Sequence, residues 1–311
     1  MKEGTKELFE KLYNENNFDE LNKHVIKRTK NVLIAFGIFI VAVAVCFPLF
    51  FIGLPILIIY VSKISSKETI EKEKNIEKEI AKIYKEKVIE PVLKYNLDNL
   101  QYMPEEGITL DEYKKAEYID RNINQVNEYS SNDHMILPLI INGQEKGNMD
   151  IYDVRVNRIY SDNDGQQTER IFEGLTLRIN LPKNINTKIK LEFKYNLFGN
   201  ETFDSNDLRL DMTEFERYFD VHCEDKILAT RIFTSEIMEK LLSLFKTKQH
   251  LFDINILEDK LFIRVHGYAF FEPFVVMNRT NYQRFEQDFL GFEEIEELTK
   301  LIYNLLENME I

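Results

Sequence analysis

The feature that most constrains this chain is a run of 30 residues, Val32 to Val61, that contains no Asp, Glu, Lys or Arg. A helix that crosses a bilayer needs about 20 consecutive apolar residues, and a buried helix of a soluble core seldom stays uncharged for so long. We therefore predict a membrane segment. The run begins too far from the N terminus and is too long to be the apolar part of a cleaved signal peptide.

The length of the run leaves two arrangements open. As one helix it would reach about 45 Å at about 1.5 Å per residue, which exceeds the hydrocarbon core of about 30 Å. Pro48 divides the run, and Gly53 and Pro55 follow soon after. A proline inside a helix removes a backbone hydrogen bond and clashes with the preceding turn. The alternatives are thus two helices joined near Pro48 and a single span.

Charge on both flanks of the run favours two helices. Lysine and arginine collect in cytoplasmic loops near the ends of spans, and a single span would carry one basic flank across the membrane. We expect a transmembrane hairpin at residues 31–65 in the cell membrane, in contact with membrane lipid, with the following domain in the cytoplasm. Because the turn is apolar, a shallow re-entrant hairpin stays open. The basic residues are Lys23, Lys27, Arg28 and Lys30 before the run and Lys63 and Lys67 after it.

Averages over the chain hide this unevenness. The 311 residues carry a net charge of −13 at a mean hydropathy of −0.32. Residues 1–30 and 63–90 each carry +1, so residues 91–311 carry −15. An acidic domain is repelled by an anionic leaflet. It also lacks the basic face that a general nucleic-acid binder needs, so we expect no nucleic-acid partner. Two cysteines exclude a disulfide scaffold.

The regions on either side of the run are expected to be helical. We predict a cytoplasmic helix within residues 1–30 and a charged amphipathic stalk helix over residues 66–105. Opposite charges alternate along the second helix, as in Glu68 and Lys72 at a spacing of four. It could serve as a stalk or coiled-coil contact, or lie on the following domain. The isoleucine intervals do not sustain the heptads that a coiled coil needs.

Residues 106–311 have the texture of one α+β domain, an antiparallel sheet with packed helices. Thr109, with Glu112 three residues later, predicts the N-cap of a short helix at 109–118. Short apolar segments separated by turn signals predict four or five antiparallel strands over 122–193. The remaining elements are a strand at 217–222, a helix at 234–247, a hairpin over 252–267 that turns at Glu258 and Asp259, and a helix at 283–309.

Three stretches together resemble the bacterial domain-of-unknown-function family DUF3137. They are ITLDEYKKAEYID at 108–120, RIFEGLTLRINLPKNI at 170–185 and FDVHCEDKILATRIFTSEIMEKLLSLF at 219–245. The chain departs from the family pattern at Thr230, where the family has alanine. The resemblance implies a membrane-anchored bacterial protein with two membrane helices near its N terminus, and a LemA-type membrane protein as a partner. It implies no activity.

Residue chemistry predicts no catalytic, cofactor-binding or metal-binding residues. His222 and Cys223 are adjacent, but neighbouring residues of a strand point to opposite faces, and Glu224 and Asp225 would disfavour a thiolate. The five histidines do not have the spacing of a local metal site. The chain has no glycine-rich phosphate loop and no nucleophile elbow.

Asp225 and Arg231 are the candidate pair. An acid and an arginine six residues apart can form an ion pair that brackets the turn before a helix starting near Thr234. Such a pair acts either as a structural clamp or as part of a ligand site.

The sequence thus predicts a membrane-tethered interaction or scaffold module with a cytoplasmic acidic domain. The alternative is a membrane-anchored enzyme or small-ligand sensor whose site is dispersed over residues 106–311. A transporter is disfavoured because the run holds no charged residue. Homo-oligomerisation stays open.

Overall fold

The computed structural model describes residues 1–18, 34, 67–116, 126–162, 165–194, 207–248, 251–267, 271–272 and 281–309. The chain divides into two compact units, one of Met1–Asn96 with Phe271–Phe285 and one of Leu97–Phe270 with Glu286–Ile311. Apart from Ile34, the predicted membrane hairpin at 31–65 lies outside the described residues. None of the helices in the described ranges is both long enough and apolar enough for a membrane span.

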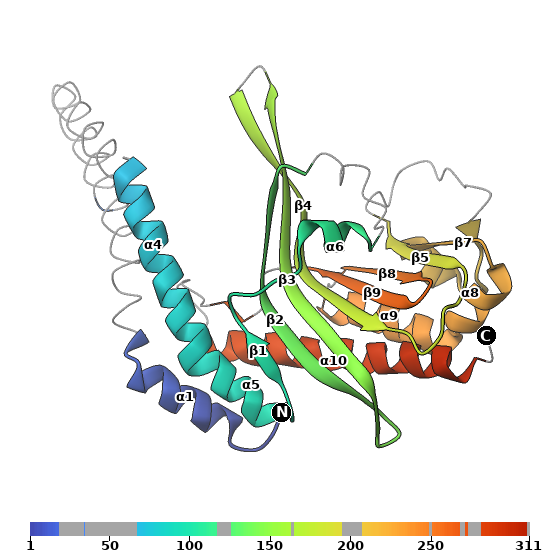
Figure 1. Ribbon diagram of the computed structural model, residues 1–311, viewed down its shortest axis with the longest axis horizontal. Coiled ribbons are helices and arrows are strands. Elements are labelled where there is room, and N and C mark those ends of the chain that lie inside the picture. Colours follow the sequence, from blue (N-terminus) through green and yellow to red (C-terminus); the bar gives the residue numbers. More distant parts are fainter. Residues whose placement is uncertain are drawn as a thin grey trace, which may run out of the picture. The chain divides into compact units, whose positions relative to one another are not determined.

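The first unit is helical. It contains α1 (Thr5–Glu15), α4 (Lys67–Tyr84), the π-helical turn η2 (Lys85–Ile89) and α5 (Glu90–Asn96) (Figure 1). The chain therefore stays helical past Pro91 and ends its helix at Asn96, within the range of the predicted stalk at 66–105. Phe9 is buried in an aromatic cluster, and its ring centroid lies 5.4 Å from those of Tyr282 and Phe285. The buried Lys85 pairs with Glu272.

The described residues of the second unit contain a nine-stranded sheet with order β1-β2-β3-β4-β9-β8-β5-β7-β6, in which every neighbouring pair is antiparallel. The predicted α+β class with an antiparallel sheet is confirmed. The strands are β1 (Gln101–Met103), β2 (Glu128–Ile141), β3 (Gln144–Asp162), β4 (Gly165–Asn180), β5 (Lys188–Phe193), β6 (Asp207–Leu208), β7 (Phe219–Cys223), β8 (Leu251–Leu257) and β9 (Lys260–His266).

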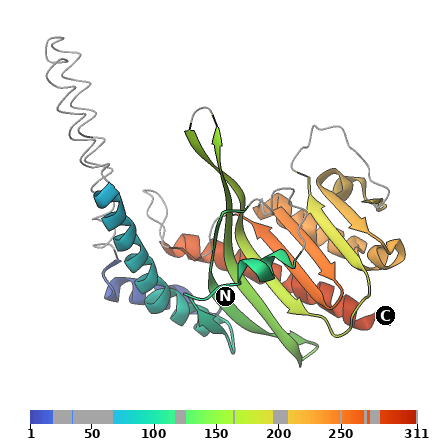
Figure 2. The same ribbon diagram turned by 45° about the horizontal axis from the view of Figure 1, so that its top comes forward.

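The two faces of this sheet differ in chemistry. Alternation along the central strands sends Leu177, Ile254 and Ile263 to one face, and all three are buried. On that side lie α9 (Ser235–Lys248) and the sheet-unit part of α10 (Asn281–Asn308), as both views show (Figures 1 and 2). The short helix α6 (Leu110–Lys114) lies across the opposite face.

Three local features differ from expectation. β1 falls inside the predicted stalk range, because residues 101–103 pair with β2. The short helices α7 (Thr213–Tyr218) and α8 (Lys226–Ile232) were not predicted, since six or seven residues give little helical periodicity. Four or five consecutive antiparallel strands were expected over 122–193. The structure has β2, β3 and β4 paired in this way, whereas β5 pairs with β7 and β8.

Candidate functional site

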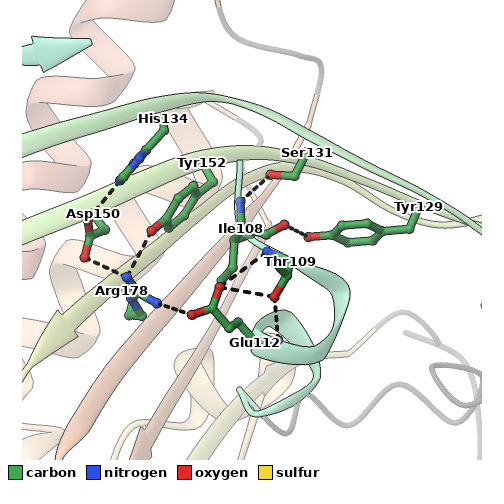
Figure 3. Close-up of polar contacts among 9 residues, drawn as sticks. All are labelled: Ile108, Thr109, Glu112, Tyr129, Ser131, His134, Asp150, Tyr152 and Arg178. Carbon is green, nitrogen blue, oxygen red and sulfur yellow. Dashed lines mark hydrogen bonds and ion pairs between the residues drawn. The ribbon is translucent and has the colours of Figure 1, made fainter. Parts of the chain in front are cut away.

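Polar side chains collect on the sheet face beneath α6. We call one group the outer network: Glu112 of α6, His134 of β2, Asp150 and Tyr152 of β3, and Arg178 of β4 (Figure 3). The β3–β4 register places Asp150 directly opposite Arg178, so these two side chains share one face. The outer network thus joins three neighbouring strands to the helix above them.

Asp150 is the centre of the outer network. Its Oδ1 lies 2.9 Å from His134 Nε2, and its Oδ2 accepts a hydrogen bond of 3.1 Å from Arg178 Nη2. Arg178 Nη2 also donates to the Tyr152 hydroxyl at 3.0 Å. The His134 and Tyr152 rings stack with centroids 4.4 Å apart. Arg178 Nη1 lies 3.6 Å from Glu112 Oε1, which links the strands to α6.

The electrostatics follow from these contacts. Burial alone would raise the pKa of Asp150, but the hydrogen bonds and positive charge of His134 and Arg178 outweigh it, so the pKa is below its ordinary value. Burial, reinforced by the Asp150 charge, raises the pKa of the Tyr152 hydroxyl to about 12. Asp150 is therefore an anion at neutral pH, and the Tyr152 hydroxyl is neutral.

The segment that carries α6 is fastened at its N-terminal end. The predicted capping box is confirmed, because Thr109 Oγ1 accepts from the Glu112 N–H at 3.2 Å and the Glu112 carboxylate reaches back to the Thr109 N–H. Ile108 N donates to Ser131 Oγ at 3.1 Å, and the Tyr129 hydroxyl donates to the Ile108 carbonyl at 2.7 Å (Figure 3).

Deeper under the same helix is the inner network of Tyr113, Asp253, Arg264 and His266. Asp253 and Arg264 are opposite each other in the β8–β9 hairpin, and both are fully buried. Arg264 Nε donates to Asp253 Oδ2 at 2.8 Å, and the same oxygen lies 2.5 Å from His266 Nε2. Arg264 Nη1 donates to the Tyr113 hydroxyl of α6 at 3.3 Å. The inner network ties α6 to the centre of the sheet.

Burial would raise the pKa of Asp253, but the charge of Arg264 and the hydrogen bond from His266 lower it to about 2. The carboxylate stays ionised in the core because its partners surround it. The guanidinium of Arg264 also lies over the Phe172 ring, 4.9 Å from its centroid. Gly174 makes this approach of β4 to β9 possible, because a Cβ there would lie 2.0 Å from the Val265 carbonyl oxygen.

Both networks join α6 to the sheet. His134 contacts Asp150 and Tyr152, and no serine, threonine or cysteine side chain among the described residues lies within hydrogen-bond reach of it. Asp150 spends its two oxygens on His134 and Arg178, so it offers little capacity for a further ligand.

The sequence-predicted pair lies elsewhere, on α8. Asp225 caps this helix by accepting the Leu228 N–H at 2.9 Å, while Arg231 lies in its last turn. Both side chains are exposed, and within the described residues no ion pair joins them. A role of these two residues in binding a ligand stays a prediction. Cys223 is buried at the end of β7, and His222 beside it points to the other face.

Sequence reasoning missed both networks, yet one of them carried a signal. The predicted two-residue turn at Glu258 and Asp259 fixes the register of the hairpin. Counting back from this turn along both strands places Asp253 opposite Arg264. No comparable count gives His134 and Asp150, since the β2–β3 register shifts twice, between Asn132 and Met135 and between Pro138 and Ile140.

Comparison with known proteins finds a family match over part of the chain. A family model described as "Protein of unknown function (DUF3137)" matches residues 170–306. This stretch is similar to the DUF3137 family. The predicted resemblance is thereby confirmed over β4 to α10, including the half of the inner network on β8 and β9, and the family description gives no activity.

Other comparisons add less. A search of curated proteins found no significant match. One solved structure, the crystal structure of the mycobacterial trehalose monomycolate transport factor A, TtfA, is similar at 10% identity and a TM-score of 0.33. The match covers 65% of this chain and 88% of the TtfA chain. A likeness of this size carries no argument about function.

Proposed function

We propose that this chain is a membrane-tethered interaction module, anchored by a hairpin within residues 31–65 and carrying its sheet unit on the cytoplasmic side of the cell membrane. The uncharged run from Val32 to Val61 supports the tether. Basic residues on both flanks support the cytoplasmic side. The partners proposed are membrane lipid and, through the family resemblance alone, a LemA-type membrane protein.

One observation carries the hairpin: the segments before and after the run pack into the same helical unit. Lys2 N donates to Asn96 Oδ1 at 2.8 Å, and the Tyr95 hydroxyl donates to the Glu3 carbonyl at 2.6 Å. Phe9 packs edge-on against Tyr84 with centroids 6.3 Å apart. A single crossing would separate these segments by the thickness of the bilayer. This packing supports a chain that enters the membrane from this unit and returns to the same side.

The choice of an interaction module over an enzyme is supported by the two networks. Their carboxylates are neutralised by neighbouring cations, and their contacts fasten α6 to the sheet instead of presenting reactive groups. A rigid sheet with satisfied internal charges is suited to presenting a surface.

A small-ligand sensor is the second candidate, and Thr176 is the observation that favours it. Thr176 lies opposite Arg264 on β4, is fully buried, and its hydroxyl has no hydrogen-bond partner among the described residues. A buried orphan hydroxyl calls for a partner such as a bound polar molecule. Native mass spectrometry of the purified chain would then show a bound mass that Thr176→Val removes. A single unliganded mass in both proteins would exclude this candidate.

The tether is tested by fractionating cells that express the full chain. We expect it in the membrane pellet after carbonate extraction, whereas the double variant Val41→Arg, Ile58→Arg should lose much of this association. A central arginine costs about 2.5–3.5 kcal/mol by insertion scales. The matched control Val41→Leu, Ile58→Leu should stay in the pellet. A wild-type chain recovered in the supernatant would overturn the tether.

A further inference from the structure

Strands β3 and β4 extend past the rest of the sheet as a two-stranded hairpin, which we call the arm: residues 158–162 and 165–170. The pairing of β3 with β2 ends at Glu128 opposite Asn157, and the pairing of β4 with β9 ends at Gly174. Beyond these positions β3 and β4 pair only with each other among the described strands. The arm projects at one end of the sheet in both views (Figures 1 and 2).

The outer edge of the arm on β3 is closed by a side chain. The Asn127 amide donates to the Ile159 carbonyl at 2.7 Å, and Asn127 Oδ1 accepts the Ile159 N–H at 2.6 Å. One asparagine thus satisfies both backbone groups that another strand would need at this point. Such a device blocks edge-to-edge pairing on β3.

The edge on β4 is open. Because both backbone groups of Ile159 face Asn127, Ile159 and its partner Thr168 form a non-hydrogen-bonded pair of the hairpin. The N–H and C=O of Thr168 therefore point away from β3. The same alternation turns the backbone groups of Gln166 and Arg170 outward. None of the three has a backbone partner on this edge among the described residues.

We propose that this open β4 edge pairs with the same edge of a second copy of the chain, antiparallel and with Thr168 on the two-fold axis. The inference rests on the proposed interaction role and names its partner. Antiparallel partners at Thr168 would exchange two backbone hydrogen bonds, and the flanking outward residues would continue the ladder. An arm that is two-stranded alone would become part of a four-stranded ribbon, which is more stable.

The side chains of the edge fit a second copy. In this register Arg170 opposes Gln166 of the other copy and Glu169 opposes Gln167, so no like charges meet. Arg170 keeps its ion pair with Glu173, and Glu169 keeps its ion pair with Arg158. A closed two-fold contact is the commonest symmetry of homo-oligomers. Tethering to one membrane raises the local concentration, which allows a contact of this modest size to persist.

The register is tested by disulfide formation in membranes from cells that express full-length Thr168→Cys in a Cys46→Ser background. Directly opposed residues of a hydrogen-bonded antiparallel pair have Cα atoms about 5.5 Å apart, within the range that a disulfide spans. Mild oxidation should give a dimer band that reduction removes. The matched control Ser161→Cys, on the closed β3 edge, should give none. Absence of the Thr168→Cys dimer, or an equal Ser161→Cys dimer, overturns the proposal.

The backbone contact is tested by proline. Thr168→Pro removes an N–H that the arm itself does not use, so the fold is kept while pairing between copies is lost. Gln167→Pro removes an N–H inside the hairpin and should destabilise the arm. Co-purification of two differently tagged full chains should be lost with Thr168→Pro at an unchanged circular dichroism spectrum. Undiminished co-purification would overturn the open-edge contact.

The two proposals fail separately. Carbonate extraction reports the tether, and crosslinking reports the edge contact. A chain that stays in the pellet without a Thr168→Cys dimer contradicts only the second copy. A crosslinked chain that leaves the pellet contradicts only the tether.

Discussion

The inner and outer networks hold the same kinds of group on one face of the sheet, an aspartate between an arginine and a histidine, but they differ in depth. Arg264 and Asp253 of the inner network are 1% and 3% exposed at their side chains, whereas Arg178 and Asp150 of the outer network are 25% and 20% exposed. Water can replace a lost partner at the surface but cannot in the core. The same kinds of interaction should therefore contribute more to the free energy of unfolding in the inner network than in the outer network.

The largest effect should come from breaking the inner pair. Asp253→Ala leaves Arg264 charged and buried, and removing one partner of a buried pair costs about 3–5 kcal/mol. Urea unfolding of the purified full chain, followed by circular dichroism, measures this loss. The matched double variant Asp253→Leu, Arg264→Met should recover most of it, because no unpaired charge remains. A small loss in Asp253→Ala would show that the inner pair is hydrated.

Acid should reveal the same pair. Because the folded-state pKa of Asp253 is lowered to about 2, its contribution is complete above its unfolded pKa of about 4 and is lost as the pH falls through the folded value. The linked loss is about 2 kcal/mol between about pH 4 and pH 2. In Asp253→Asn the unfolding free energy measured across this range should depend less steeply on pH. An unchanged slope in that variant would assign the acid sensitivity to other carboxylates.

The outer pair should matter less. Asp150→Ala frees His134 and Arg178, but both groups reach solvent and Arg178 retains Glu112 as a partner. We expect a loss of about 1 kcal/mol in the same unfolding experiment, as for a partly exposed charged hydrogen bond. A loss equal to that of Asp253→Ala would remove the distinction between the two networks.

The smallest effects should come from the exposed pair on α8, Asp225 and Arg231. Asp225→Ala removes an N-cap and should cost about 1 kcal/mol. Arg231→Ala should cost less than about 0.5 kcal/mol, as for surface substitutions away from packed features. A double-mutant cycle should show no coupling, because the two side chains act at opposite ends of the helix. A measurable coupling energy would restore the clamp that the sequence suggested.

Sequence reasoning predicted what local patterns determine. The Thr109 capping box, the turn at Glu258 and Asp259, and the long last helix are all encoded by neighbouring residues, and all are confirmed. The outer network was missed because it depends on register shifts in β2 that leave no local signature. The return of Phe271–Phe285 to the N-terminal unit was also missed, because a contact between segments far apart in the sequence leaves no local pattern.

The central claim is that the chain enters the membrane and returns to the side from which it entered. Cysteine labelling in intact cells tests this claim most directly. In a Cys46→Ser background, Lys11→Cys on α1 and Ile227→Cys on α8 place exposed thiols before and after the run. A membrane-impermeant maleimide should label neither residue until the cells are permeabilised, and then both. Labelling of one residue and not the other in intact cells would show a single span and contradict the account.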